Sequence, residues 1–171
     1  MENSLTDQLL ESSLIIDEEL EQFSTNFVNP LGGTASGDTA KRKVVMQYWY
    51  DGYIFCLWLG LRYKFKKRSW KPKTKANRIW GDNRRKNQYL YLITKMLSEK
   101  ENQIELGFDS RERLKEIGNI KMLSDKINNL ANQYAFGGLS LLKELHDKNE
   151  RLFDDIDYIL EVVRELDEQY L

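Results

Sequence analysis

The chain has a single cysteine, a single histidine and only two prolines among its 171 residues. With Cys56 alone, no disulfide can form within the chain. A zinc site needs several Cys or His ligands, and Cys56 and His146 are the only two such residues present. The scarcity of proline and the abundance of Leu, Lys, Glu and Asn favour helices. Composition therefore predicts a helical protein without an internal cross-link or zinc centre, and Cys56 is expected to be a buried apolar residue.

Motifs of enzymes and of nucleotide-binding loops are also lacking. Neither GxxxxGK[ST] nor GxGxxG occurs. His146 has no carboxylate or nucleophile at a recognisable spacing, so we interpret it as a surface or capping residue near a helix end. Asp154, Asp155 and Asp157 lack a second cluster of oxygen ligands, so a solvated acidic face is a simpler interpretation than a divalent-metal site. We predict a protein that is not an enzyme and that uses no cofactor and no metal.

Long apolar runs are scarce as well. The most apolar stretch, Val44 to Leu61, is near the minimum length of a membrane span, but Gln47, Asp51 and several tyrosines interrupt it. The N-terminal sequence MENSLTDQLLESS lacks the basic segment and apolar core of a secretory signal. Together with the single cysteine, these features predict a cytoplasmic protein that has no membrane partner.

Charge is abundant but unevenly distributed. Residues 1–40 carry eight acids and no Lys or Arg, residues 41–95 carry sixteen bases and two acids, and residues 96–171 carry ten bases and seventeen acids. The three segments therefore hold −8, +14 and −7, which sum to the net charge of −1. A polyanion or an acidic protein surface would suit the basic middle. Alternatively, the acidic ends fold against the middle and neutralise it.

The N-terminal segment, residues 1–40, is predicted to be an acidic helix followed by a flexible linker. Ser4-x-x-Asp7 is typical of a helix start, and apolar residues from Leu5 to Phe27 then recur at mostly helical spacing. Residues Asn29 to Ala40 hold Pro30 and three glycines, which break a helix. This linker is the best candidate for a domain boundary, and residues 41–171 form the predicted helical domain.

Apolar stripes at helical spacing recur through residues 41–171. The first, from Val45 to Leu59, is apolar nearly all round and indicates a central or interface-buried helix. A second helix follows to about Lys100, with a buried stripe predicted at Tyr89, Leu92, Ile93, Met96 and Leu97. After it come a connection from Asn102 to Phe108, a short helix, and a long helix beginning at Ser124. The pair Gly137-Gly138 in this helix indicates close helix packing, a kink or a break. The last helix has an apolar stripe predicted at Phe153, Ile156, Leu160, Val163, Leu166 and Tyr170. The prediction is an all-α, single compact bundle of five to seven helices with a basic loop and an N-terminal helical arm.

The segment Arg62 to Lys86 joins the apolar helix to the next one and carries twelve bases against one acid, Asp82. Lys and Arg neutralise phosphates, and exposed aromatic residues stack on bases, so the segment is a candidate DNA- or RNA-binding surface. An acidic protein partner is the alternative, and Tyr63 and Trp80 could equally anchor the segment to the core. The predicted nucleic-acid-binding residues are Arg62, Lys64, Lys66, Lys67, Arg68, Trp70, Lys71, Lys73, Lys75, Arg78, Arg84, Arg85 and Lys86.

Two stretches resemble a known family. DGYIFCLWLGLRYKFKKRSWKP (Asp51 to Pro72) is an apolar helix ending in Leu-Gly with a basic tail. YAFGGLSLLKELHDKNERLFDDIDYILEVV (Tyr134 to Val163) has Tyr-Ala-x-Gly-Gly-Leu and a leucine-rich turn, followed by an acidic helix. Together they resemble the small proteins associated with bacterial Dnd systems, which are encoded beside DNA phosphorothioation and restriction genes. The resemblance implies a small accessory subunit with no catalytic residues to transfer.

The sequence thus leads to two functional hypotheses. The first is a non-catalytic accessory subunit of a bacterial anti-phage DNA-defence complex, which binds a larger ATPase or nuclease subunit and contacts DNA through its basic segment. The second is a free-standing nucleic-acid-binding module. Binding of DNA by the isolated chain and copurification with neighbouring gene products distinguish the two.

Overall fold

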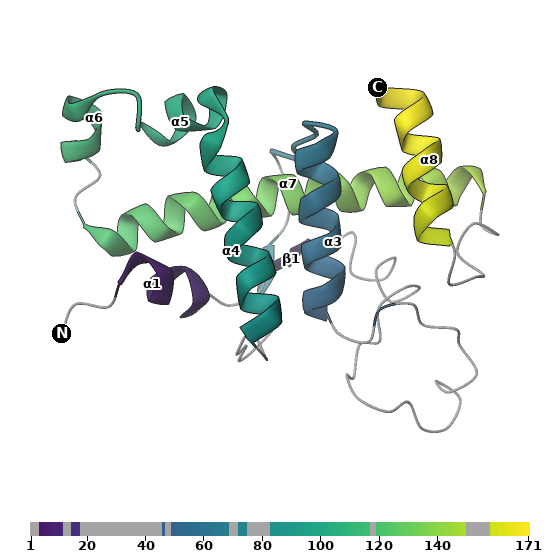
Figure 1. The fold of residues 1–171 in the computed structure, drawn as a ribbon, viewed down its shortest axis with the longest axis horizontal. Helices are drawn as coiled ribbons and strands as arrows, with labels where there is room; N and C mark the ends of the chain where they lie inside the picture. The colour runs from purple at the N-terminus through teal and green to yellow at the C-terminus, as the bar shows by residue number, and fades with distance from the viewer. Residues whose placement is uncertain are drawn as a thin grey trace. The chain divides into compact units, whose positions relative to one another are not determined.

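The computed structural model describes residues 4–11, 15–17, 46, 49–68, 72–74, 83–116, 119–149 and 158–171 (Figure 1). These residues form seven helices: α1 (Leu5–Glu11), α3 (Trp49–Arg62), α4 (Asn83–Ser98), α5 (Lys100–Leu106), α6 (Arg111–Glu116), α7 (Ile120–Lys148) and α8 (Tyr158–Tyr170). Two three-residue strands, β1 (Ile15–Asp17) and β2 (Pro72–Thr74), pair with each other. The predicted all-α class, with five to seven helices, is confirmed.

The residue contacts divide the chain into two units. Unit 1 comprises residues 1–15 and 74–133, and unit 2 comprises residues 16–73 and 134–171. Helix α7 therefore contributes its first half to unit 1 and its second half to unit 2. The predicted linker at residues 29–40 lies outside the described residues, so the division into residues 1–40 and 41–171 stays a prediction.

The N-terminal helix begins where the sequence predicts and ends earlier than expected. Ser4 and Asp7 form a reciprocal capping box: the Ser4 amide donates to Asp7 Oδ2 at 3.1 Å, and the Asp7 amide donates to Ser4 Oγ at 3.2 Å. Helix α1 stops at Glu11, and Ile16 lies in strand β1. The prediction that one helix continues through Ile16 is therefore wrong. The predicted continuation from Leu20 to Phe27 lies outside the described residues.

The core of unit 1 contains the predicted apolar stripe of α4. Tyr89, Leu92, Ile93 and Met96 are buried, and Leu97, the fifth predicted member, is half-buried. The predicted connection over Asn102 to Phe108 is wrong, because residues 100–106 form α5. Asn102 is fully buried, and its Nδ2 donates to the Met96 carbonyl at 2.8 Å, while Gln103 Nε2 donates to the Leu97 carbonyl at 2.9 Å. The polar residues that suggested a loop instead satisfy carbonyls in the last turn of α4.

The long helix α7 also begins before its predicted start. Its cap is Asn119, whose Oδ1 accepts from the Met122 amide at 2.9 Å, and the helix proper starts at Ile120 rather than at Ser124. Ser124 is 1% exposed, so it lies within the buried face of the helix instead of capping it. An Asn at the N-cap serves the same role as the Ser expected further along the chain.

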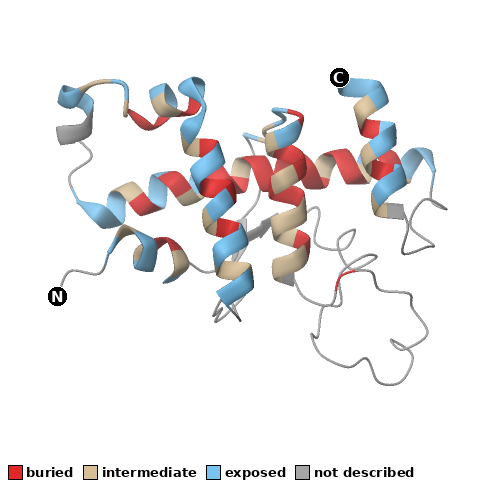
Figure 2. Cartoon of the chain, in the orientation of Figure 1, coloured by how far each residue is buried: buried red, intermediate tan, exposed pale blue. Residues whose placement is uncertain are grey.

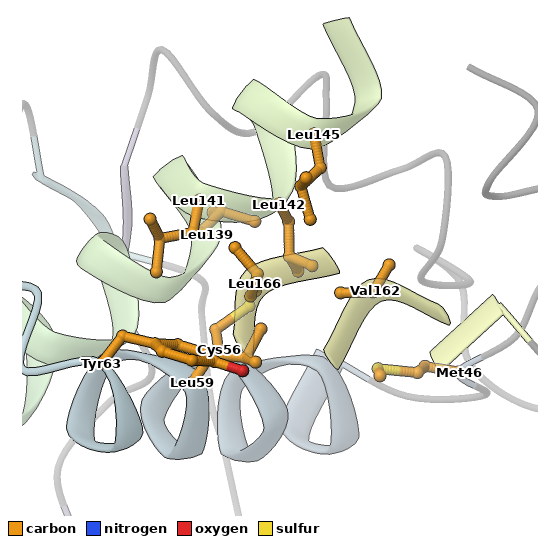
Figure 3. Packing of buried hydrophobic residues seen from close by; sticks show 10 residues of the cluster. All are labelled: Met46, Cys56, Leu59, Tyr63, Leu139, Leu141, Leu142, Leu145, Val162 and Leu166. Carbon is orange, nitrogen blue, oxygen red and sulfur yellow. The ribbon is translucent and has the colours of Figure 1, made fainter. Parts of the chain in front are cut away.

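The core of unit 2 is built from α3, the second half of α7 and α8. Ten buried residues form one cluster: Met46, Cys56, Leu59, Tyr63, Leu139, Leu141, Leu142, Leu145, Val162 and Leu166 (Figure 3). Every residue of α7 from 134 to 139 is buried. Figure 2 shows buried residues, in red, along the middle of α7. Cys56 is 4% exposed, and burial raises the pKa of its thiol, which confirms the expected buried apolar role.

The buried face of α8 differs from the predicted stripe. Val162 and Leu166 are buried, with Ile159 and Val163 partly buried against the cluster. Leu160, which the stripe places inward, is 74% exposed. The error is one of helical phase: Val162 and Leu166 are four residues apart and share a face, and Leu160 points away from that face. Phe153 and Ile156 lie outside the described residues.

Candidate nucleic-acid interface

The basic segment begins at the end of α3, where this helix crosses α7 at a contact between backbones. A Cβ atom built on Gly60 would come within 3.0 Å of the Tyr134 carbonyl, and one on Gly138 within 3.0 Å of the Cys56 carbonyl. Only glycine allows this approach. Of the interpretations that the sequence left open for Gly137-Gly138, close helix packing is therefore correct, and the uninterrupted run of α7 excludes a break.

The chain leaves α3 through a Schellman motif, which is a common way to end a helix. The Phe65 amide donates to the Gly60 carbonyl at 2.9 Å, and the Lys64 amide donates to the Leu61 carbonyl at 3.4 Å. Lys64 occupies the left-handed position of this motif, with φ of 51°. Helix α5 ends in the same motif, but there the left-handed residue is Gly107, with φ of 82°. A lysine thus stands where glycine is usual and less strained.

The residues after α3 are held against α7. A Cβ on Gly137 would come within 3.0 Å of the Phe65 carbonyl, so the backbone of the turn rests directly on that glycine. Lys66 lies with its Nζ 4.9 Å from the centre of the Tyr134 ring, a cation–π contact with the same helix. We call residues 63–68 the basic turn. Its backbone position is fixed at both Phe65 and Lys66.

The side chains of the basic turn differ in their exposure. Lys64 and Arg68 are exposed, and Lys66 and Lys67 are half-buried. Phe65 is 38% exposed although it lies beside the core of unit 2. Four cations and an aromatic ring are therefore presented within six residues. The side chains of Lys64 and Arg68 are in the best position to reach an anion in solvent.

Arg62, the first of the predicted binding residues, is engaged within the chain. Its Nε and Nη2 donate to Asp167 of α8, at 3.1 Å and 2.9 Å from Oδ1, and Nη2 also lies 2.8 Å from Oδ2. Tyr63 donates its hydroxyl to the same carboxylate at 2.8 Å. One base of the basic segment is thus matched by one acid of the C-terminal segment. For Arg62, the alternative in which an acidic end of the chain neutralises the basic middle is therefore correct.

The same network shifts the protonation of its members. The hydrogen bonds from Arg62 and then from Tyr63 lower the pKa of the Asp167 carboxyl. Burial, followed by the hydrogen bond to Asp167, raises the pKa of Tyr63 to about 12. Tyr63 is 9% exposed, so this tyrosine anchors the segment to the core, one of the two roles that the sequence left open.

The remaining predicted residues lie elsewhere or outside the described part. Arg84, Arg85 and Lys86 lie in the first turn of α4, which belongs to unit 1, so they are not part of the basic turn. Lys73 lies in strand β2. Four predicted residues lie outside the described residues: Trp70, Lys71, Lys75 and Arg78. The residues that the structure brings together are thus Lys64, Lys66, Lys67 and Arg68.

Sequence reasoning missed two residues of this site. Phe65 is not among the predicted binding residues, although its place inside the run KFKK is a visible signal. Asp167 lies 105 residues from Arg62, and no local spacing could have matched them. The pairing depends on how α8 packs beside α3, which only tertiary structure provides.

Metal-binding groups and membrane-spanning helices are both missing from the described ranges. No group of three His, Cys, Asp or Glu side chains that could hold a metal ion is found among the described residues. The described helices also include none with the length and apolarity needed to cross a bilayer.

Unit 1 has an open depression of about 370 Å³ between α5 and α7, lined by Glu105, Leu106, Asp125, Lys126, Asn129, Leu130 and Gln133. Asp154, Asp155 and Asp157 lie outside the described residues.

Comparison with protein-family models, curated proteins and solved structures returned no match to this chain. The resemblance to Dnd-associated proteins therefore rests on the two stretches identified above. Both stretches belong to unit 2, where α3 and α7 meet at the glycine contact. They contain the basic turn and most of its supports.

Proposed function

We propose that this chain is a non-catalytic accessory subunit of a bacterial anti-phage DNA-defence complex, which contacts DNA through its basic segment and binds a larger ATPase or nuclease subunit. The observation that carries the DNA contact is the basic turn, in which exposed Lys64 and Arg68 flank half-buried Lys66 and Lys67 on a fixed backbone. The membership of a defence complex is supported by the resemblance of residues 51–72 and 134–163 to Dnd-associated proteins.

The turn has the chemistry of a phosphate-contacting surface rather than of a catalytic site. Each lysine or arginine that neutralises a phosphate releases a counterion from the DNA, and the affinity then falls steeply with salt. Placing a lysine at the strained position 64 adds a charge where a glycine would suit the fold better. A lysine that makes the fold less stable than glycine would is expected at position 64 if its charge contacts a ligand.

The contact with a larger subunit is assigned to the outer face of α8. Helix α3, the most apolar helix, is occupied by the chain's own core through Cys56 and Leu59. On α8, Leu160 is 74% exposed, and Leu171 just beyond the helix is 80% exposed. Residues 11 apart fall close to the same face of a helix, because 11 residues complete about three turns. The two leucines thus lie on one side of the acidic helix, Leu160 in its first turn and Leu171 just past its last residue, and both are open to a partner protein.

Binding of DNA by the purified chain, measured by anisotropy across a salt series, tests the first part. Reversing the charge of Lys64, Lys67 and Arg68 by changing each to Glu is expected to weaken binding and to flatten its dependence on salt. The log–log slope should fall by about 0.9 for each phosphate that is no longer neutralised. The matched control reverses Lys100, Lys121 and Lys126, three exposed lysines of unit 1. Equally weakened binding in both variants would assign the effect to net charge instead of to the turn, and would contradict the proposal.

Copurification with the products of neighbouring genes tests the second part. The wild-type chain is expected to stay bound to a larger subunit, and the double variant Leu160→Lys and Leu171→Lys is expected to lose that partner while keeping its thermal stability and DNA affinity. A control variant changes Arg164, which is 81% exposed on the same helix, to Ala. A chain that binds DNA but stays monomeric with every neighbouring product would instead be a free-standing nucleic-acid-binding module.

A further inference from the structure

Phe65 is an exposed aromatic ring in the middle of the basic turn. Its neighbours Lys64 and Lys66 are cations, and Arg68 follows three residues later. Large apolar side chains on a surface are common singly, but this one is 38% exposed on a turn that otherwise presents positive charge. A ring between cations matches the chemistry of a strand of nucleic acid, in which a flat base alternates with a phosphate.

The ring is also presented on a backbone that two contacts hold in place. The Phe65 amide donates to the Gly60 carbonyl at 2.9 Å, and the Phe65 carbonyl rests against Gly137 of α7. The next residue, Lys66, contacts the Tyr134 ring, 4.9 Å away. Because the backbone is held on both sides, little conformational entropy remains for this residue to lose on binding. An aromatic residue held in this way suits a stacking platform.

We infer that the basic turn binds an unpaired strand of nucleic acid, with Phe65 stacking on a base and the exposed cations Lys64 and Arg68 contacting phosphates. In a duplex the faces of each base are covered by its neighbours, so a surface ring reaches a base only by unstacking a step, which disfavours the duplex. An unpaired base offers its face without that cost. The inference rests on the proposed function, since it specifies which form of DNA the same turn prefers.

The test compares single-stranded and duplex DNA of equal length and mixed sequence, by anisotropy with the full chain. Phe65→Leu is expected to weaken single-strand binding roughly 10-fold and to leave duplex binding nearly unchanged, because leucine keeps the apolar contacts but has no ring to stack. Phe65→Trp is expected to retain or strengthen single-strand binding. A fluorescent base analogue in the single strand should be quenched by the wild-type chain and by Phe65→Trp, and not by Phe65→Leu.

Tyr91→Leu is the matched control. Tyr91 is 61% exposed on α4, and Lys95 lies 5.8 Å from its ring, so it is another exposed aromatic beside a cation but outside the turn. This variant is expected to bind both forms of DNA as the wild type does. Thermal unfolding of each variant shows whether an effect arises from loss of the fold.

The outcomes separate this inference from the proposed function. If Phe65→Leu alters single-strand and duplex binding equally, or alters neither, stacking by Phe65 is wrong while DNA contact by the turn stands. If the wild-type chain binds neither form at low salt, the DNA contact itself is wrong. A single-stranded RNA of the same sequence forms a further arm. Equal affinity for it would show that the turn reads base faces and phosphates without regard to the sugar.

Discussion

The carbonyl oxygen of Cys56 occupies the space that a side chain on Gly138 would need, because a Cβ there would come within 3.0 Å of it. This contact between α3 and α7 sets the depth at which the two helices cross. It also places the basic turn, since Phe65 rests on the neighbouring Gly137. Stability and the candidate binding surface therefore depend on the same pair of glycines.

Gly138→Ala is expected to destabilise the protein. Alanine would gain about 1 kcal/mol of helix propensity, but the overlap with the Cys56 carbonyl forces the helices apart, at a typical cost of about 1–3 kcal/mol or more. The net result is a lower midpoint in urea unfolding. Ser140→Ala, two residues later in the same helix, is the control and is expected to change stability little. A Gly138→Ala variant that is more stable than wild type would show that the helices do not meet at this depth.

Lys64→Gly is expected to stabilise the fold and to weaken DNA binding. Lys64 has φ of 51°, a conformation that costs a non-glycine residue roughly 1 kcal/mol and glycine little. Lys64→Ala removes the same charge but keeps the strain, so it should lose affinity without gaining stability. Urea unfolding and anisotropy, measured on both variants, provide the check. Equal stability of the glycine and alanine variants would contradict a strained residue at position 64.

The stability of the protein is expected to fall at both ends of the pH range because of the network that Asp167 forms with Arg62 and Tyr63. The pKa of Asp167 is lowered from 3.8, so its contribution is full above that value and is lost as the pH falls through the lowered pKa. The pKa of Tyr63 is raised from 10.0 to about 12, so its contribution is full below pH 10 and is lost as the pH rises through 12.

Thermal unfolding across pH measures both effects. Asp167→Asn is expected to reduce the acid destabilisation, and Tyr63→Phe is expected to reduce the alkaline destabilisation without abolishing it. Part of the alkaline effect remains in that variant because burial also raises the pKa of Tyr89 in unit 1. Variants whose pH profiles run parallel to that of the wild type would show that the hydrogen bonds to Asp167 do not form in solution.

Asn102→Ala is expected to destabilise unit 1 by about 1–3 kcal/mol. Asn102 is fully buried and donates to the Met96 carbonyl, so its truncation leaves that carbonyl at the end of α4 without this donor in a dry environment. Glu101→Ala, an exposed change in the first turn of α5, is the control. Hydrogen exchange at the amides of α4 gives the readout, with faster exchange expected in Asn102→Ala alone.

Much of the fold could be predicted from local sequence, because local signals act within one turn of helix. The Ser4–Asp7 capping box and the buried stripe of α4 are both visible in the sequence and are both found. The sequence-based predictions were wrong where one local pattern is compatible with two structures. Asn102 and Gln103 are typical of a loop, yet here they donate to the last carbonyls of the preceding helix.

The sequence by itself determined the helical class, the position at which α1 begins, the burial of Cys56 and the concentration of positive charge after α3. Each of these follows from composition or from spacing along the chain. Tertiary structure decided the meaning of Gly137-Gly138, the pairing of Arg62 with Asp167, and which cations of the basic turn stay exposed. These depend on residues that lie far apart in the sequence. No local sequence pattern identifies which distant backbone or charged side chain a residue will contact.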